Sequence, residues 1–310
     1  MSTNNQNDPQ TTGHQWDVEM DGSGAIEEFD NPIPTWWLWS FYISFVICFG
    51  YWILYPVWPM GNTFTKGIST IEYTVNGKQE SSHWNTRALF LSDLQTGEES
   101  LKMQKHMDEL SNASYDEILD DPKKLAFVHA AAKGIFGDIC ASCHGRGGVG
   151  VIGLFPNLAD DDWLWGGKIE TIEATIRHGR DGFMPAFNET FSSKQLDQVV
   201  EYVYSLSQAD ADTAKAAQGE EIFKGQTGGC HYCHTKEATG MTAMGSANLT
   251  DSIWTIADVP GAADGVAKRA VIRAVINDGV TRQMPPWAER LSDSQIKLLA
   301  VYVHQLGGGQ

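Results

Sequence analysis

Two stretches in the C-terminal half decide the fold: IRHGRDGFMPAF at residues 176–187 and INDGVTRQMPPW at residues 276–287. They align at an offset of one hundred residues, which pairs Met184 with Met284, and each methionine is followed by proline. Self-similarity at a fixed offset is the sequence signature of a duplicated structural unit. We therefore predict two tandem copies of one small domain.

The match continues on both sides of these stretches. Residues 192–206 and 292–306 each begin with Ser-x-x-Gln, a helix-capping pattern, and then place apolar residues at helical spacing. Upstream, PNLADDDW at 156–163 corresponds to ANLTDSIW at 247–254. The duplicated domain is therefore expected to be helical, with the joint between the copies near residues 208–213.

Each copy carries one Cys-x-x-Cys-His motif. Two thiols about one helical turn apart can each form a thioether to a haem vinyl group, and the histidine that follows is placed to ligate the iron, which is the c-type haem attachment pattern. The motif residues are Cys140, Cys143 and His144 in the first copy, and Cys230, Cys233 and His234 in the second. We predict two covalently bound haem c groups.

Two other interpretations of these cysteines fit the sequence less well. A thioredoxin-like redox pair belongs in a βαβ context, which this helical sequence lacks. A zinc site would have to combine cysteines and histidines from both motifs, yet the motifs lie 90 residues apart in separate copies. The repetition of the motif at the same place in a repeated domain favours haem.

A haem held by one histidine leaves a sixth iron position, and Met184 and Met284 are the candidates for it. Proline after each methionine stiffens the loop that presents the sulfur. Met241 and Met244 are rivals in the second copy, but the first copy has no counterpart to them. His/Met ligation fills both axial positions and raises the reduction potential, which suits electron transfer.

An uncharged segment, WWLWSFYISFVICFGYWILYPVW at residues 36–58, precedes the repeats. As a helix it would be about 34 Å long, enough to cross a hydrocarbon layer of about 30 Å. Tryptophan and tyrosine gather at both ends, as in the interfacial belts of spanning helices. A buried core helix is the alternative, and a cleaved signal peptide fits poorly because no basic residue precedes the segment. We predict a membrane anchor.

The remaining segments are polar. Residues 1–35 contain seven acidic and no basic residues and are predicted to be a flexible arm. Residues 59–125 are expected to be a connector, irregular at first and helical from Arg87 to Leu119. The whole chain has 22 Lys and Arg against 39 Asp and Glu, a net charge of −17, and a field of this sign repels nucleic acid. The two repeated domains are assigned to residues 126–208 and 213–307.

The residues around these motifs resemble one family. EEFDNPIPTWWLWSFYISFVICFGYWILYP at 27–56 is similar to the anchor of the dihaem subunit (subunit III, CcoP or FixP) of cbb3-type cytochrome c oxidases. GDICASCHGRGGVGVIGLFPNLADDDWLWGGKIETIEATIRHGRDGFMPAF at 137–187 resembles the first haem domain of that family. The resemblance implies a mainly α protein: one N-terminal transmembrane helix followed by two tandem class I cytochrome c-like helical domains.

The resemblance also implies a function within a complex. Such subunits take electrons from soluble or membrane cytochrome c donors and pass them to a monohaem cytochrome subunit, and from there to the catalytic haem-copper subunit, which reduces O₂ to water. The chain itself would perform no O₂ chemistry. Its expected partners are those two subunits, the donor and membrane lipid, with no nucleic acid.

By the same resemblance the four motif cysteines hold the haems, His144 and His234 are the proximal iron ligands, and Met184 and Met284 are the sixth ligands. Which methionine serves which haem stays open: each domain can supply its own, or packed tandem domains can exchange loops. Bacterial c-type haems are attached outside the cytoplasmic membrane. We therefore expect a single-pass protein of the bacterial inner membrane with a cytoplasmic N-terminus and periplasmic haem domains.

Three rival functions share part of this pattern. An anchored dihaem carrier that serves a different enzyme would have every haem residue in common. A dihaem peroxidase needs one iron with an exchangeable position, which the paired Met-Pro motifs argue against. A redox or gas sensor would need an output domain, and the N-terminal arm has none that is recognisable.

Overall fold

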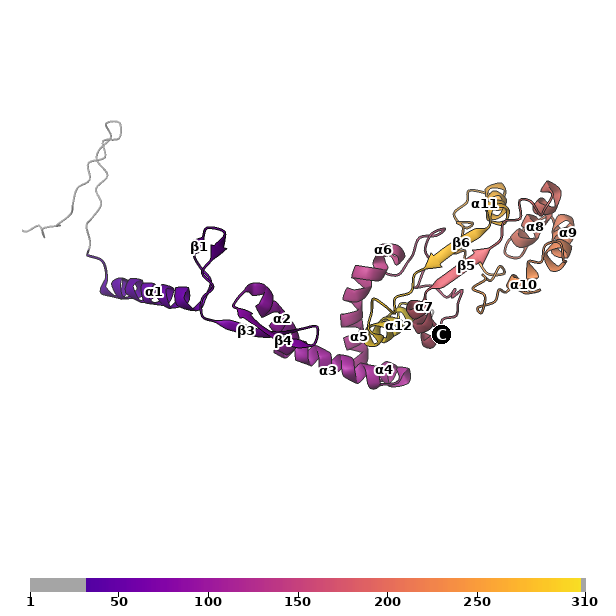
Figure 1. Cartoon of the computed structure of the whole chain (residues 1–310). Helices are drawn as coiled ribbons and strands as arrows, with labels where there is room; N and C mark the ends of the chain where they lie inside the picture. Colours follow the sequence, from indigo (N-terminus) through magenta and orange to yellow (C-terminus); the bar gives the residue numbers. More distant parts are fainter. Residues whose placement is uncertain (1–31, 308–310) are drawn as a thin grey trace, which may run out of the picture. The chain divides into compact units, whose positions relative to one another are not determined.

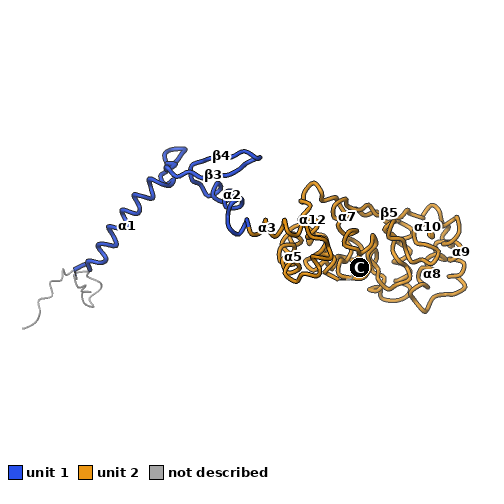
Figure 2. Tube along the Cα trace, turned by 90° about the horizontal axis from the view of Figure 1, so that it is seen from below, with its two compact units in different colours: residues 1–101 blue, residues 102–310 orange. Residues whose placement is uncertain are grey.

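The computed structural model describes residues 32–307, and Figure 1 traces them from the N-terminal helix to the last turn. Most described elements are helices, so the predicted mainly helical fold is confirmed. The chain divides after Leu101 into two compact units, shown in different colours in Figure 2. The predicted arm at residues 1–35 lies outside the described residues, except for its end at 32–35.

The first unit begins with the predicted apolar helix, α1, which spans Thr35–Leu54. None of its residues is buried within the chain, as expected of a helix that packs in lipid. The helix ends before the predicted boundary at residue 58. Tyr55 precedes Pro56 and is extended, with φ −122° and ψ 158°, because the proline ring disfavours helical conformation in the residue before it. Twenty residues still span about 30 Å.

Two β-hairpins follow where an irregular segment was expected. The strands β1 (Pro59–Met60) and β2 (Thr63–Phe64) form the first hairpin, and β3 (Thr70–Val75) and β4 (Lys78–His83) form the second. The second hairpin turns at an Asn-Gly pair, residues 76–77, with φ of 51° and 75°. Asn-Gly is the preferred pair for such a turn because both residues need positive φ.

The helices of the connector come next, and α3 runs across the division between the units. They are α2 (Thr86–Thr96), α3 (Glu98–Asn112) and α4 (Tyr115–Asp120). An asparagine caps the first of them: the Asn85 side chain accepts a hydrogen bond from the backbone N–H of Ala88. The last begins with a capping box between Ser114 and Glu117.

The second unit holds the repeated elements. In the first copy these are α5 (Pro122–Ile135), a π-helical turn (Phe136–Cys140), α6 (Ala141–His144), α7 (Ile169–His178), β5 (Arg180–Met184) and α8 (Ser193–Ser205). In the second they are α9 (Thr213–Lys224), α10 (His231–His234), α11 (Gly265–Asp278), β6 (Val280–Met284) and α12 (Asp293–His304). The apolar run at residues 122–144 is also long enough to span a membrane, but Val128, Ala132 and Phe136 are buried in the unit's core.

The two hydrophobic cores do not follow the two copies. The last helix of the second copy, α12, packs against α5 and α7 of the first, while α8 of the first copy packs against α9 and α11 of the second. Figure 1 shows the two groups at opposite ends of the β5–β6 ribbon. Residues of one core include Val128, Phe136, Ile172, Ile296 and Leu299, and those of the other include Val199, Val203, Phe223, Ile272 and Ile276.

The chain of each copy passes to the core of the other copy at the antiparallel pair of strands β5 and β6. Arg180 is opposite Met284, and Met184 is opposite Val280. Beyond the strands each chain segment continues along the other copy: the backbone N–H of Phe187 donates to the carbonyl of Ile276, and that of Trp287 donates to the carbonyl of Ile176. The ranges 126–208 and 213–307 remain a prediction for the sequence repeats, and each core draws on both ranges.

Candidate functional site

The two Cys-x-x-Cys-His motifs occupy matching short helices. Cys143 and His144 lie in α6, Cys233 and His234 lie in α10, and in each case the first cysteine directly precedes the helix. Because successive residues in a helix turn by about a quarter to a third of a turn, the cysteines of one motif lie roughly one turn apart. This is the spacing that attachment of one haem by two thioether bonds requires.

Both histidines are held by the same backbone contact. The Nδ1 atom of His144 lies 3.0 Å from the carbonyl oxygen of Pro156, and that of His234 lies 2.9 Å from the carbonyl oxygen of Ala247. A carbonyl only accepts, so Nδ1 carries the proton in each ring and Nε2 keeps its lone pair. Burial lowers the pKa of both histidines, which favours the neutral, metal-ligating form. Each histidine is therefore prepared to ligate through Nε2.

The cysteines themselves are poorly suited to thiol redox chemistry. Burial raises the pKa of Cys140 and of Cys230 to about 11. The reactive cysteine of a thioredoxin-like pair has a lowered pKa, since the thiolate is the nucleophile. The shift in the opposite direction supports the haem interpretation over a dithiol catalyst.

Both motifs open onto one cavity of about 620 Å³. Its lining includes the two histidines, Met184 and Met284, and is mostly apolar, with Phe155, Trp165 and Trp287 among the large side chains. An apolar enclosure around a few ligating groups is typical of cofactor sites. The methionines predicted as sixth ligands and the motif histidines are therefore brought to one enclosure.

Each methionine packs with the motif of the other copy. Met284 and Cys140 are both packed against the core that holds α5, α7 and α12, whereas Met184 and Cys230 are both packed against the core that holds α8, α9 and α11. The rival methionines of the second copy, Met241 and Met244, are exposed on the loop after α10, and Met244 lies at the edge of the same cavity. The arrangement places Met284 in the same core as Cys140, and Met184 in the same core as Cys230.

Two glycines fix this cross-packing. Gly179, with φ +70°, ends α7, and a Cβ there would overlap the carbonyl of Met284 and lie 2.8 Å from the nitrogen of Pro286. Gly279, also at φ +70°, ends α11, and a Cβ there would lie 2.6 Å from the carbonyl of Met184. Only glycine tolerates both this φ and this approach, so each copy's glycine receives the Met-Pro loop of the other.

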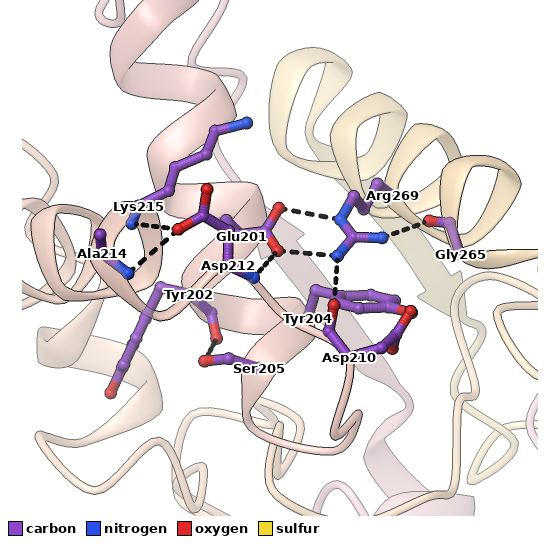
Figure 3. Close-up of polar contacts among 10 residues, drawn as sticks. All are labelled: Glu201, Tyr202, Tyr204, Ser205, Asp210, Asp212, Ala214, Lys215, Gly265 and Arg269. Carbon is purple, nitrogen blue, oxygen red and sulfur yellow. Dashed lines mark hydrogen bonds and ion pairs between the residues drawn. The ribbon is translucent and has the colours of Figure 1, made fainter.

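A buried ion pair ties α8 to α11. The carboxylate of Glu201, whose side chain is 3% exposed, accepts hydrogen bonds of 2.8 Å from Nε and from Nη2 of Arg269. It also accepts one of 2.8 Å from the backbone N–H of Asp212, and the guanidinium lies 3.8 Å from the ring centre of Tyr204 (Figure 3). These contacts hold the first copy's last helix against the second copy's α11.

The cavity contains donors that sequence reasoning did not single out. Trp163 Nε1 and Thr255 Oγ1 are buried without a hydrogen-bond partner among the described residues, and both residues line the cavity. Arg180 and Arg282 line it as well. A haem carries two carboxylates that need such donors, so these residues fit that group. Only Trp163 had a sequence signal, since Trp254 takes its place in the second copy.

Comparison with known proteins agrees with this architecture. The family model for the N-terminal domain of cytochrome oxidase-cbb3, FixP, matches residues 8–62. The model for cytochrome c oxidase, cbb3-type, subunit III matches residues 128–203 and again residues 214–303. The two matches to one model confirm tandem cytochrome c domains.

Full-length relatives carry the same name. The cbb3-type cytochrome c oxidase subunit FixP of Azorhizobium caulinodans is 39% identical, over 97% of this chain and 94% of its own. Subunit CcoP of Cereibacter sphaeroides is 38% identical, over 98% of this chain and 96% of its own. The chain therefore belongs to the cbb3-type cytochrome c oxidase subunit III family: it is a haem c-bearing, electron-transferring subunit of an oxidoreductase complex, with an apolar N-terminal helix suited to the inner membrane.

Proposed function

We propose that this subunit holds two haem c groups and relays electrons from a cytochrome c donor to the monohaem and haem-copper subunits of the oxidase. The observation that carries the proposal is the pair of Cys-x-x-Cys-His motifs that open onto one cavity beside two strand-borne methionines. In this proposal the subunit carries no O₂-reducing site of its own.

The iron ligands are proposed to be exchanged between the copies. His144 and Met284 would serve the haem on Cys140 and Cys143, and His234 and Met184 would serve the other. The support is the shared core of Met284 with Cys140 and of Met184 with Cys230. The glycine contacts at the ends of α7 and α11 support the same pairing.

The chemistry divides between the cofactor and the chain. The haem, when bound, supplies the one-electron ferric/ferrous couple. The chain's cysteines fix the position of the cofactor, and the Nδ1–carbonyl contacts of the two histidines set ring orientation and increase ligand basicity. A methionine thioether would hold the remaining iron position, where O₂ or peroxide would otherwise bind. This filled position favours an electron carrier over a peroxidase.

The proposed topology follows from where c-type haems are attached. Helix α1 would cross the inner membrane once, with residues before it in the cytoplasm and the haem unit in the periplasm, where a soluble or membrane cytochrome c donor has access. The partners within the membrane would be the haem-copper subunit, the monohaem subunit and lipid. Family membership favours this assignment over a carrier for a different enzyme or a sensor.

Co-purification tests the functional assignment. The chain would be tagged, extracted from native membranes in mild detergent, and assayed for covalent haem, haem b, copper and cyanide-sensitive oxygen uptake. We expect all four to travel with the chain at two covalent haems per copy of it. Recovery of two covalent haems without oxidase subunits would indicate a free-standing carrier and contradict the proposed place in the complex.

A matched pair of variants tests the ligand exchange. Replacing Cys140 and Cys143 by serine removes one haem, which should halve the absorption band of Met-ligated ferric haem. Adding Met284→Ala to that background should cause no further loss, whereas adding Met184→Ala should abolish the band. The reverse result would show that each copy supplies its own methionine.

A further inference from the structure

The β5–β6 pair presents two arginines that the proposed iron ligation does not use. Along each strand alternate residues are half-buried and exposed. The half-buried face carries Arg180 and Met184 from β5, and Arg282 and Met284 from β6. Successive side chains of a strand point to opposite faces, so both arginines share the cavity face with both methionines.

Arg282 lies midway between the two methionines on this face. It is two residues from Met284 along β6, and it is opposite Gly182, which is two residues from Met184 along β5. Two residues of a strand span about 7 Å, so the backbone of Arg282 is roughly equidistant from both methionines. Arg180 instead lies at one end, opposite Met284.

The contacts of the two arginines leave most of their charge uncompensated. Arg282 donates through Nη2 to the carbonyl of Gly153. Arg180 donates through Nε to Thr175 Oγ1 at 2.9 Å, and its guanidinium lies 4.9 Å from the ring centre of Trp165. Between residues 32 and 307 neither arginine forms an ion pair with a carboxylate, whereas the guanidinium groups of Arg177, Arg269 and Arg273 all do.

The acidic residue that lines the cavity does not neutralise them. Asp162 has a pKa raised to about 6 by burial and by the charges of Asp251 and Asp160. A neighbouring guanidinium would lower that pKa, and neither arginine is among the charges that act on Asp162. Thr255 is 6% exposed and its hydroxyl has no partner in the described part of the chain, which places another unused donor on the same enclosure.

A haem c brings two propionate carboxylates, and a buried carboxylate needs charged or hydrogen-bonding partners. We propose that Arg282 is the shared carboxylate-binding cation of both haem sites, and that Arg180 serves only the site of His144 and Met284. This assignment rests on the proposed haem ligation. A positive charge beside an iron favours the ferrous state, which carries one positive charge fewer. Arg282 therefore raises both reduction potentials and Arg180 raises one.

Redox titration of the full-length, haem-loaded chain in detergent tests this assignment. Arg282→Gln should lower the equilibrium constant for reduction of both haems, each on the order of tenfold, as for unit charges about 10 Å apart at an effective dielectric constant of about 20. Tenfold corresponds to about 59 mV for a one-electron couple. Arg180→Gln should lower one potential only, that of the haem whose potential also falls in Met284→His. Lys194→Gln, which removes the same charge from an exposed position on α8, should change neither.

Two further readouts separate the outcomes. Arg282→Lys keeps the charge and should keep both reduction potentials close to wild type. Equal falls in potential in Arg282→Lys and Arg282→Gln would overturn the charge assignment. A fall in Arg282→Gln at only one haem, or at neither, would overturn it as well. Haem content and the band of Met-ligated ferric haem are measured on every variant. A wild-type chain without two such haems would instead refute the proposed function on which the assignment rests.

Discussion

Arg269→Ala tests whether α8, which packs against the second copy, is held there by the buried ion pair between Glu201 and Arg269 that Figure 3 shows. The substitution removes two hydrogen bonds of 2.8 Å from the carboxylate of Glu201 and leaves it only the backbone N–H of Asp212. The Glu201 side chain is 3% exposed beside Arg269, so the carboxylate is largely removed from water and depends on these partners. Loss of one partner from a buried pair costs about 3–5 kcal/mol, and we expect a destabilisation of that size.

Arg273→Ala is the matched control. Arg273 lies one turn further along α11 and also reaches across to α8, where it pairs with Asp197. The side chains of that pair are 37% and 45% exposed, so solvent screens the interaction and the expected loss is at most about 1 kcal/mol. The two variants remove the same residue type from the same helix and differ mainly in the burial of the partner.

Denaturant unfolding of the haem-loaded, full-length chain, followed by the absorbance of Met-ligated haem, measures both losses from the shift in midpoint. The hydrogen bonds of Arg269 lower the pKa of Glu201 below its usual 4.5. The stabilisation is therefore present above about pH 4.5 and is lost as the pH falls through the folded-state pKa, so the gap between wild type and Arg269→Ala should narrow in acid. Equal losses in the two variants at pH 7 would refute the reasoning.

Three other predictions follow from the same contacts. Gly179→Ala should cost at least about 1–2 kcal/mol, because alanine at φ +70° is strained and its Cβ overlaps the carbonyl of Met284; loss of half the Met-ligated haem band checks it, and an unchanged band would contradict it. Asp162, with a pKa of about 6, gains a negative charge as the pH rises, so a haem midpoint potential should fall between about pH 5 and 7; titration of Asp162→Asn should show this slope removed, and a slope that persists would assign it elsewhere. Residues 102–310 form a compact unit without α1, so this fragment, exported behind a cleavable signal peptide in cells without the other oxidase subunits, should leave the membrane fraction with both haems attached, and membrane retention would indicate a second anchor.

The elements of the fold were largely predictable because their signals are local. Helical spacing, capping residues and an uncharged apolar run act over a few turns, and they located α1, α8 and α12 in advance. The main wrong prediction, an irregular segment after α1 where the structure has two β-hairpins, also concerns local sequence. Asn-Gly at 76–77 is a strong hairpin signal, yet its flanking strands alternate weakly, with mostly exposed side chains in β4.

The site was predictable only in part. The motif cysteines and histidines are adjacent in sequence, so their chemistry can be inferred without a fold. Arg282 gave no signal, because the equivalent position in the first copy is Gly182 and its relevance depends on the strand register. The pairing of methionines with motifs also depends on tertiary packing, since two copies of one fold offer each last helix two similar docking surfaces.

The last helix of each copy can pack within its own copy or, by exchange, against the other copy. Charged residues that differ between the two copies distinguish these two packings. At the offset of one hundred, Glu201 of α8 corresponds to Val301 of α12, and Arg269 of α11 corresponds to Ile169 of α7. Packing within each copy would set Glu201 against Ile169 and Val301 against Arg269, which buries two charges without partners. In the exchanged packing Glu201 pairs with Arg269. Ile169 and Val301 then lie together in the other hydrophobic core. An unpaired buried charge costs several kcal/mol, so this position alone favours exchange.

A second pair of positions, one helical turn away, also favours the exchanged packing, because packing within each copy would bring like charges together. Asp197 of α8 corresponds to Lys297 of α12, and Arg273 of α11 corresponds to Glu173 of α7. Packing within each copy would oppose Asp197 to Glu173 and Lys297 to Arg273, two pairs of like charge. In the exchanged structure Asp197 pairs with Arg273, and Lys297 lies near enough to Glu173 to lower its pKa. Because like charges penalise one packing and unlike charges stabilise the other, the divergence of the two copies favours the exchanged packing, and it supports the pairing of methionine with histidine that we propose.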